Sequence, residues 1–318
     1  MQMFDRDMVE ELLDMSGCIG AMRQVLADYS AGRTVQVLRT AMPFEPGKIL
    51  GVMPAALPGL GLAGAKLLTV YPGNGRKGLP SHQGVVALFS SDDGRLAALC
   101  DAEAITGVRT AAASAAATDA LARKDAHILC LMGTGLQARR HMEAMRLVRP
   151  IDKVRVWGRD RERTARFVRE IADQYGIPVE DCCGDAEKAV SGADIVCTVT
   201  AATEPILFGR YLSPGTHVNA VGACGAVHRE LDAEAVARAR LFCDSRESCL
   251  SEAGDFLIPL KEGTISAGHL LGEVGRVFSG DLPGRLTDDD ITLFESQGLA
   301  VEDLAAAHYV LQKALSGV

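Results

Sequence analysis

Residues 127–138 read His-Ile-Leu-Cys-Leu-Met-Gly-Thr-Gly-Leu-Gln-Ala. The apolar run 127–132 predicts a short buried strand, and the residues from 137 onward predict a helix. Between them, Gly133, Gly135 and Ala138 fit the pattern G-x-G-x-x-[GA]. The first glycine permits a tight turn, the second lets a pyrophosphate approach the backbone, and the small third residue lets helix and strand pack closely. The stretch therefore predicts a Rossmann phosphate loop made of Gly133, Thr134, Gly135, Leu136, Gln137 and Ala138.

The chain after residue 125 alternates between strand and helix patterns. Strands are predicted at 153–157, 193–199, 216–221 and 241–244, and helices at 137–147 and 161–175. This alternation is typical of a parallel sheet with helices on both faces. The glycine motif alone could be an ordinary tight turn, but the strand before it, the helix after it and the next strand favour a dinucleotide site. The predicted fold class is therefore α/β, with a Rossmann doubly wound parallel sheet.

The first part of the chain has a different pattern. An amphipathic helix is predicted at 5–31, a helix N-capped by Asp101 at 102–122, and strands at 35–42, 49–53, 63–71, 84–90 and 95–100. The segment Asp92-Asp93-Gly94 predicts a turn between the last two strands. We expect an antiparallel sheet here. The tail, 299–315, predicts an amphipathic helix that returns to this part, so the domains are expected to be discontinuous.

Composition excludes several classes of function. The net charge of −8 disfavours nucleic-acid binding, which needs clustered positive charge. The nine cysteines contain no CxxC pair and no histidine at metal-finger spacing, so no metal site is expected. Their odd number and the polar, acidic start of the chain lead us to expect a reducing cytoplasm rather than secretion. No apolar run has the length needed to span a bilayer.

The segment after the second Rossmann strand bears on the choice of nicotinamide cofactor. NAD enzymes usually place an acidic residue at this strand end to bind the ribose, but Trp157 and Gly158 stand there. Arg159 and Arg161 could hold a 2′-phosphate, which leans towards NADP. Alternatively, both arginines face solvent at a helix start that Asp160 caps, and Asp160 could also reach a ribose. NAD and NADP both stay open.

Several long stretches give the chain a specific resemblance. They are residues 66–71, 79–83, 105–112, 198–208, 219–223 and 300–303. Through them the chain resembles the ornithine cyclodeaminase/mu-crystallin family over nearly its whole length. The stretches Pro-Ser-His-Gln at 80–83 and Thr-Glu-Pro-Ile-Leu-Phe at 203–208 look most like the mu-crystallin branch.

This resemblance implies a fold and a chemistry. It implies a Rossmann NAD(P)-binding domain (116–299) inserted into an α+β domain that binds substrate and forms a homodimer (1–115 with 300–318). Members of the family move hydride between a nicotinamide and the α-carbon of an amino or imino acid. The residues expected to line the cofactor beyond the phosphate loop and Arg159 or Asp160 are Thr198, Val199, Thr200, Val221, Gly222 and Ala223.

Three cations lie among apolar residues in the first part of the chain: Arg39, Lys66 and Arg109. A charge in such a setting is costly unless it is paired or functional, and each one alone is more often a snorkelling or salt-bridged side chain. The resemblance implies that all three bind the substrate carboxylate. Arg39 and Arg109 suit a bidentate clamp. Lys66 would be a third clamp or the proton donor to the imine nitrogen.

Other basic residues carry weaker expectations. His82 is expected in a loop beside these cations, where its ring could relay a proton or have no role. The residues Arg76, Lys77, His228 and Arg229 could meet a second substrate carboxylate, which would suit iminosuccinate and its reduction to L-aspartate.

The segment 222–231 argues against the reaction that names the family. Cyclodeaminases carry an aspartate where this chain has Cys224, and a lysine where it has His228. A neutral thiol cannot replace that carboxylate unless its pKa is lowered, and we expect Cys224 to pack rather than react. The expected function is an NAD(P)H-dependent imine reductase that converts an α-imino acid, iminosuccinate or a cyclic ketimine, to the L-amino acid. The alternatives are a cyclodeaminase-type lyase and a non-catalytic NADPH or small-ligand binding protein; the three cations disfavour the second.

Overall fold

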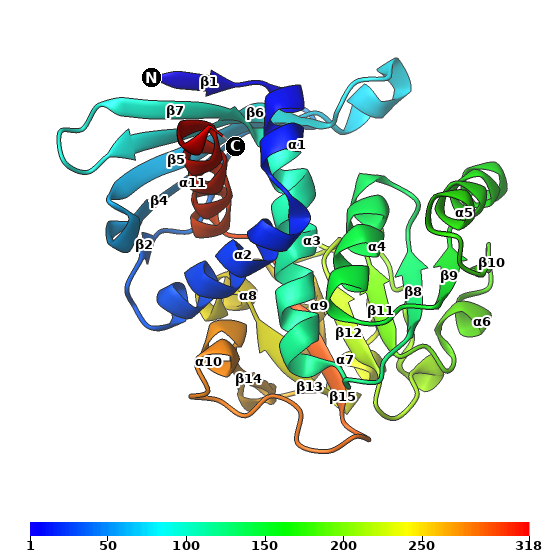
Figure 1. Ribbon diagram of the computed structural model, residues 1–318. Coiled ribbons are helices and arrows are strands. Elements are labelled where there is room, and N and C mark those ends of the chain that lie inside the picture. The colour runs from blue at the N-terminus through cyan, green and yellow to red at the C-terminus, as the bar shows by residue number, and fades with distance from the viewer. Residues whose placement is uncertain (318) are drawn as a thin grey trace. The chain divides into compact units, whose positions relative to one another are not determined.

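The run after His127 forms strand β8 of a parallel sheet in the computed structural model, which describes residues 1–317 except for the side chains of residues 75 and 76 (Figure 1). Within that range the sheet has eight strands in the order β10-β9-β8-β11-β12-β15-β13-β14, and every pair is parallel. The strands are β8 (Ile128–Met132), β9 (Lys153–Trp157), β10 (Val179–Asp181), β11 (Ile195–Thr198), β12 (His217–Ala220), β13 (Ala239–Cys243), β14 (Leu270–Glu273) and β15 (Ile291–Glu295). The predicted doubly wound α/β fold is confirmed.

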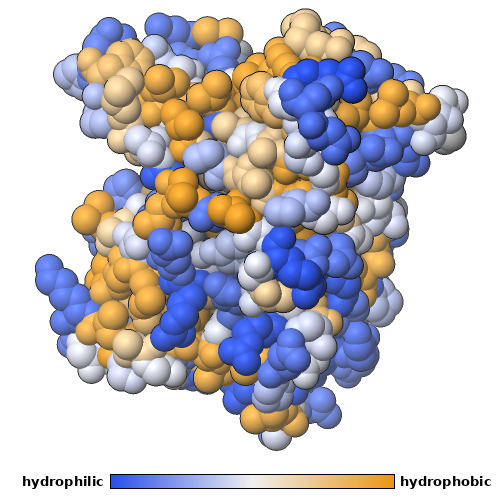
Figure 2. Space-filling view, turned by 90° about the vertical axis from the view of Figure 1, so that its left-hand side faces the viewer, coloured by the Kyte–Doolittle hydropathy of each residue, from blue (hydrophilic) through white to orange (hydrophobic). Residues whose placement is uncertain are grey.

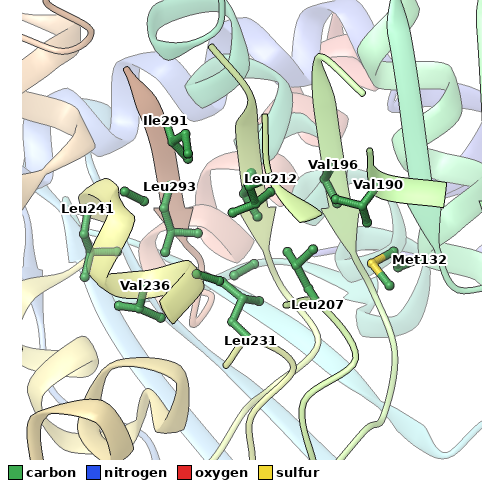
Figure 3. Close-up of a cluster of buried hydrophobic side chains, with 14 of the residues drawn as sticks. Met132, Val190, Val196, Leu207, Leu212, Leu231, Val236, Leu241, Ile291 and Leu293 are labelled. Carbon is green, nitrogen blue, oxygen red and sulfur yellow. The ribbon is translucent and has the colours of Figure 1, made fainter. Parts of the chain in front are cut away.

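Residues 1–317 divide into two compact units, one of residues 1–112 with the segment from Gly298, the other of residues 113–297. The second unit holds the parallel sheet and the helices α4 (Leu136–Val148), α5 (Arg161–Tyr175), α6 (Ala186–Val190), α7 (Ala233–Arg238), α8 (Arg246–Glu252), α9 (Gly254–Glu262) and α10 (Val274–Phe278). Helix α3 (Ala102–Leu121) contributes residues to both units. Figure 3 shows part of the core of the second unit, where Met132, Val196 and Leu293 from three strands lie with Leu207 and Leu231 from loops. Strands β8, β11, β12 and β15 are almost entirely buried, because both faces of a parallel sheet are covered.

Polar side chains fix α3 to the core of the second unit. The buried guanidinium of Arg149 donates to the carbonyl oxygens of Thr118 and Ala122 at 3.0 Å each, which satisfies the end of the helix. The Nδ2 of Asn219, in β12, donates to Thr118 Oγ1 at 2.9 Å. These contacts hold the last turns of α3 in one position.

The sheet of the first unit is mostly antiparallel, with the order β1-β7-β6-β5-β4-β2 and β3 paired with β4. Its strands are β1 (Gln2–Phe4), β2 (Val35–Gln36), β3 (Thr40–Glu45), β4 (Lys48–Leu57), β5 (Leu62–Val70), β6 (His82–Ser90) and β7 (Leu96–Asp101). The expected antiparallel pattern is wrong at one edge, because β1 pairs with β7 in parallel. The expected helix at 5–31 is two helices, α1 (Arg6–Leu12) and α2 (Met15–Ser30), since Asp14 caps a second start by accepting from Gly17 N at 2.7 Å.

The two faces of this sheet differ. Helix α11 (Ala300–Ser316) lies across β4, β5 and β6 (Figure 1), and Val86 and Leu88 are fully buried on the face that it covers. On the opposite face, Val85 and Phe89 are 38% and 40% exposed, and Leu67 is 42% exposed. Figure 2 shows apolar patches among hydrophilic side chains on one side of the molecule. Exposed apolar side chains in such number are typical of a surface that another molecule covers.

All nine cysteines lie within the described residues and are free thiols. In residues 1–317, no group of three or more histidine, cysteine or acidic side chains is placed to hold a metal ion. No helix in that range is long and apolar enough to cross a membrane.

Candidate functional site

A buried cluster of charges joins three elements of the first unit. Lys66 comes from β5, Arg109 from α3, and Asp303 from α11. The carboxylate atom Asp303 Oδ1 accepts from Lys66 Nζ at 3.0 Å and from Arg109 Nε at 3.0 Å. The structure therefore places two of the three predicted substrate cations side by side, held by one shared carboxylate oxygen.

The neighbours of these cations complete their hydrogen bonds. Arg109 Nη1 donates to Glu302 Oε2 at 2.7 Å, and Lys66 Nζ donates to Thr106 Oγ1 at 2.5 Å. Thr106 lies one helical turn before Arg109 on α3, so both side chains point the same way. Lys66 and Arg109 are 4% and 5% exposed, and neither carboxylate has any exposed surface. At this depth a cation is tolerated only because it is paired.

The pKa values of the two cations shift in opposite directions. It lowers the pKa of Lys66, as does the charge of Arg109, while Asp303 opposes the fall. Burial also tends to lower the pKa of Arg109, but the charges of Asp303 and Glu302 outweigh it and raise that pKa. Arg109 is therefore a permanent cation, whereas Lys66 can lose its proton more readily than an ordinary lysine.

The other two predicted residues lie at the edge of the cluster. Arg39 Nη2 donates to Gly298 O at 2.9 Å. A Cβ on Gly298, which has a φ of +76°, would lie 2.7 Å from Arg109 Nη1, so a glycine lets the chain pass directly against the guanidinium. His82 pairs with Val70 on β5, with its ring nitrogen Nδ1 2.9 Å from Ser81 Oγ. The expected loop position is wrong, because His82 begins strand β6. Desolvation and the charge of Lys66 lower the pKa of His82.

The charges in this cluster do not cancel. Among the described residues, the three cations Arg39, Lys66 and Arg109 stand against the two carboxylates Glu302 and Asp303. Since His82 has a lowered pKa, it adds little positive charge near neutral pH. Counted over these five side chains alone, the cations outnumber the carboxylates by one. The cluster therefore suits a ligand that brings one negative charge, such as a carboxylate. The sequence prediction missed Glu302 and Asp303 as site residues.

The second unit contains the predicted phosphate loop. Gly133 has a φ of +133°, and a Cβ there would lie 3.0 Å from the carbonyl oxygen of Val199. Gly135 is the N-cap of α4, and no atom lies within 4 Å of where its Cβ would be. The loop thus combines open space at a backbone turn with the free amide groups of a helix start, which fits a pyrophosphate.

The segment after β9 is compatible with both NAD and NADP, whose ribose carries a 2′-phosphate. Gly158 is buried, and a Cβ on it would lie 2.3 Å from Thr164 Oγ1. Arg159 and Asp160 are exposed, and the carboxylate of Asp160 caps α5 by accepting from Arg163 N at 2.9 Å. The cap predicted from the sequence is therefore present, and Arg159 is open to a ligand.

Two loops follow β11 and β12 at the carboxyl edge of the sheet. Thr198 ends β11, and the loop after it contains Val199 and Thr200; the loop after β12 contains Val221, Gly222 and Ala223. These are the residues expected to line the cofactor. Val221 N donates to Thr198 O at 3.1 Å, and a Cβ on Gly222 would lie 2.1 Å from Thr200 O. The loops are therefore in direct contact. In doubly wound sheets this edge is where ligands bind.

The loop that contains Cys224 differs from expectation. Cys224 is exposed, so the expected packing role is wrong. His228 is exposed as well, whereas Arg229 is paired with Glu262 at 3.2 Å. Lys77 is exposed in the 3-10 helix Pro72–Lys77 of the first unit, and the side chain of Arg76 lies outside the described residues.

Known proteins resemble this chain over nearly its whole length. The family model described as "Ornithine cyclodeaminase/mu-crystallin family" matches residues 1–318. Ketimine reductase mu-crystallin from Mus musculus is 39% identical over 312 residues, which cover 97% of this chain and 95% of that protein.

Two solved structures extend the comparison. Delta(1)-pyrroline-2-carboxylate reductase from Thermococcus litoralis, in complex with NADH and L-proline, has a TM-score of 0.96 and 35% identity, covering 100% of this chain and 98% of that one. Iminosuccinate reductase from Paracoccus denitrificans, in complex with NAD+, has a TM-score of 0.92 and 28% identity, covering 99% and 96%. These relatives confirm the expected enzyme class, an NAD(P)-dependent oxidoreductase acting on C–N bonds. The chain belongs to the ornithine cyclodeaminase/mu-crystallin family.

Proposed function

We propose that the chain is an NAD(P)H-dependent imine reductase that converts a cyclic α-imino acid with one carboxylate to the L-amino acid. The observation that carries this proposal is the cluster of Lys66, Arg109 and Arg39, which keeps one positive charge after Asp303 and Glu302 are counted. Relatives that reduce ketimines and pyrroline-2-carboxylate support the same reaction class.

In this mechanism the cluster binds the substrate carboxylate. Arg109 and Arg39 hold its oxygens, and the contact of Gly298 with both side chains keeps them in one orientation. When bound, the reduced nicotinamide supplies a hydride to the imine carbon; the C=N bond becomes C–N, and the nitrogen takes up one proton. Holding the imino acid in a fixed position contributes much of the rate.

Lys66 is placed to provide that proton. An ammonium group has three hydrogens to donate, and in the described structure Thr106 and Asp303 accept two of them. The third is available to the substrate. Because a protonated imine is the better electrophile, an acid of lowered pKa near the nitrogen speeds the hydride step. His82 is the alternative donor. Because its pKa is lowered, only a small fraction of its ring is protonated near neutral pH.

The charge balance favours a monocarboxylic substrate over iminosuccinate. A second carboxylate would need a further cation, and Arg229 is already paired with Glu262. A panel of imino acids assayed with NADH and with NADPH tests this choice. We expect kcat/KM at least about tenfold higher for pyrroline-2-carboxylate than for iminosuccinate, since one unpaired carboxylate costs about 1.4 kcal/mol or more. Equal values for mono- and dicarboxylic substrates would refute it, and the NADH-to-NADPH ratio shows whether Arg159 receives a 2′-phosphate.

Asp303→Asn should lower the activity of the protein without abolishing it. The amide keeps the shape of Asp303 but removes the charge that Lys66 and Arg109 share. We expect kcat/KM to fall by roughly tenfold to a hundredfold, because hydrogen bonds to a charged group contribute about 1.5–3 kcal/mol. Steady-state kinetics at several pH values measures it. Asp14→Asn, a helix-cap change on the same unit, is the matched control, and the idea fails if the two variants have the same kcat/KM.

We also propose that the chain forms a homodimer through the exposed face of the first unit's sheet. Leu67, Val85 and Phe89 make that face apolar, and a second copy would remove this surface from water. Sedimentation velocity measures the assembly directly, and a monomer at micromolar concentration would contradict the proposal.

A further inference from the structure

A single buried carboxylate connects the two loops at the carboxyl edge of the parallel sheet. Glu230 follows β12 by ten residues and has no exposed surface. Its Oε1 accepts from Thr200 N at 2.7 Å and from Thr200 Oγ1 at 2.5 Å. Its Oε2 accepts from Gly222 N at 2.8 Å. Each oxygen therefore serves a different loop, one after β11 and one after β12.

The backbone of Glu230 is itself held firmly. The amide groups of Glu230 and Leu231 donate to Asp255 Oδ1, in α9, at 2.9 and 2.7 Å. The carbonyl oxygen of Glu230 accepts from Ile206 N at 2.7 Å and from Leu207 N at 2.9 Å. The carboxylate is thus presented from a rigid base, so it can fix the loops rather than follow them.

The loops after β11 and β12 are tightly packed against each other at Gly222. A Cβ on Gly222 would lie 2.1 Å from Thr200 O and 2.7 Å from Glu230 Oε1. Backbone, carboxylate and hydroxyl groups are therefore in contact at one point. A buried polar group in such a place keeps a unique geometry only while every partner is satisfied.

We propose that Glu230 is a positioning residue that joins residues 198–203 and 221–225 into one rigid wall for the nicotinamide end of the dinucleotide. This inference rests on the proposed function, which requires the cofactor at this edge of the sheet. Glu230 does not contact the reacting atoms; it sets the positions of the two loops that do. The required property is the pair of acceptor oxygens, because both of its partner loops present N–H groups.

Glu230→Gln separates this role from simple packing. Glutamine has nearly the same volume, but one of its oxygens becomes an NH2 group, which would face the N–H of either Thr200 or Gly222. We expect the Kd for NADH to rise roughly tenfold or more from the lost bond. We also expect faster amide hydrogen exchange in residues 198–203 and 221–225 of the protein without cofactor. Glu230→Ala should be no worse than Gln for NADH affinity.

The chain offers its own probe and its own control. Trp157, the one tryptophan, lies at the end of β9 in the same unit and can transfer excitation to bound NADH, so quenching of its emission measures Kd. Glu234→Gln makes the same chemical change on α7, where Glu234 pairs with Arg238 near the surface. This control should leave Kd and hydrogen exchange unchanged.

Three outcomes would be informative. A higher Kd with faster exchange in both loops supports the positioning role. The inference would be overturned if Glu230→Gln had the Kd for NADH and the hydrogen exchange of the wild type, and only Glu230→Ala lost affinity. That result would show that Glu230 only fills space. If the wild-type protein binds neither NADH nor NADPH, the proposed function itself fails, and this result is recognised before any variant is compared.

Discussion

Arg109→Ala should lower kcat/KM for the imino acid by about 10³-fold or more, since two hydrogen bonds to a charged carboxylate contribute roughly 4 kcal/mol together. The affinity for NADH should stay the same, because Arg109 lies in the first unit and the phosphate loop in the second. The variant should also be less stable by about 3–5 kcal/mol, since Glu302 and Asp303 lose a buried partner. Steady-state kinetics, NADH titration and chemical denaturation measure the three effects.

A double substitution separates catalysis from folding in this experiment. Arg109→Met with Glu302→Gln removes one cation and one carboxylate together, so much of the stability should return while turnover stays low. Arg33→Ala, at an exposed ion pair with Asp28, should change neither property. A loss of NADH affinity in parallel with turnover would mean that Arg109 serves folding. Turnover close to wild type would remove it from the carboxylate site.

Lys66→Met should lower kcat by about 10²–10⁴-fold, the range that general acid catalysis provides. Its effect should depend on pH. Burial lowers the pKa of Lys66 from 10.5, and the group is a proton donor only below that pKa. The kcat/KM of the wild-type protein should therefore fall as pH rises through the lowered pKa of Lys66, and this alkaline limb should vanish in Lys66→Met.

Lys66→Arg distinguishes the two roles open to this residue. Arginine keeps the positive charge but does not give up its proton in this pH range. If Lys66 only clamps the carboxylate, the Arg variant should keep much of the activity. If Lys66 donates the proton, kcat should fall in the Arg variant almost as far as in Met. If the alkaline limb of the pH profile is unchanged in both variants, the proton donor is His82 or a water molecule rather than Lys66.

The phosphate loop could be predicted from sequence because its requirements are local. Gly133 needs a positive φ, and Gly135 needs open space before a helix; both needs are written within a few residues. The parallel sheet was predicted from the alternation of strand and helix patterns after residue 125. Strands β10, β14 and β15 were not predicted, because a short run without clear turn signals cannot be assigned to a strand from its sequence pattern.

The charge balance of the site could not be predicted in the same way. Arg109 and Asp303 are 194 residues apart, and Lys66 and Asp303 are 237 apart. No local pattern shows that two acidic residues at the start of the last helix will meet cations from β5 and α3. The stretch Ala300-Val301-Glu302-Asp303 was visible only as part of a resemblance. Its sequence signal is a pair of carboxylates on an otherwise apolar helix face, which costs free energy unless cations meet it.

The same reasoning explains two corrections. His82 follows Pro80 and Ser81, which suggest a loop, yet pairing with Val70 extends β6 to include it. Cys224 lies among small residues, which suggests packing, yet its loop leaves the thiol exposed. For His82, pairing with strand β5 decided the outcome.

Whether the protein reduces imino acids is measured by mixing the purified protein with Δ1-pyrroline-2-carboxylate and NADH or NADPH, and following the absorbance of the reduced nicotinamide. We expect nicotinamide oxidation to match the formation of L-proline one for one, with no ammonia released. No oxidation with any imino acid at saturating cofactor would contradict it. Ammonia release from ornithine without net change in the nicotinamide would instead identify a cyclodeaminase.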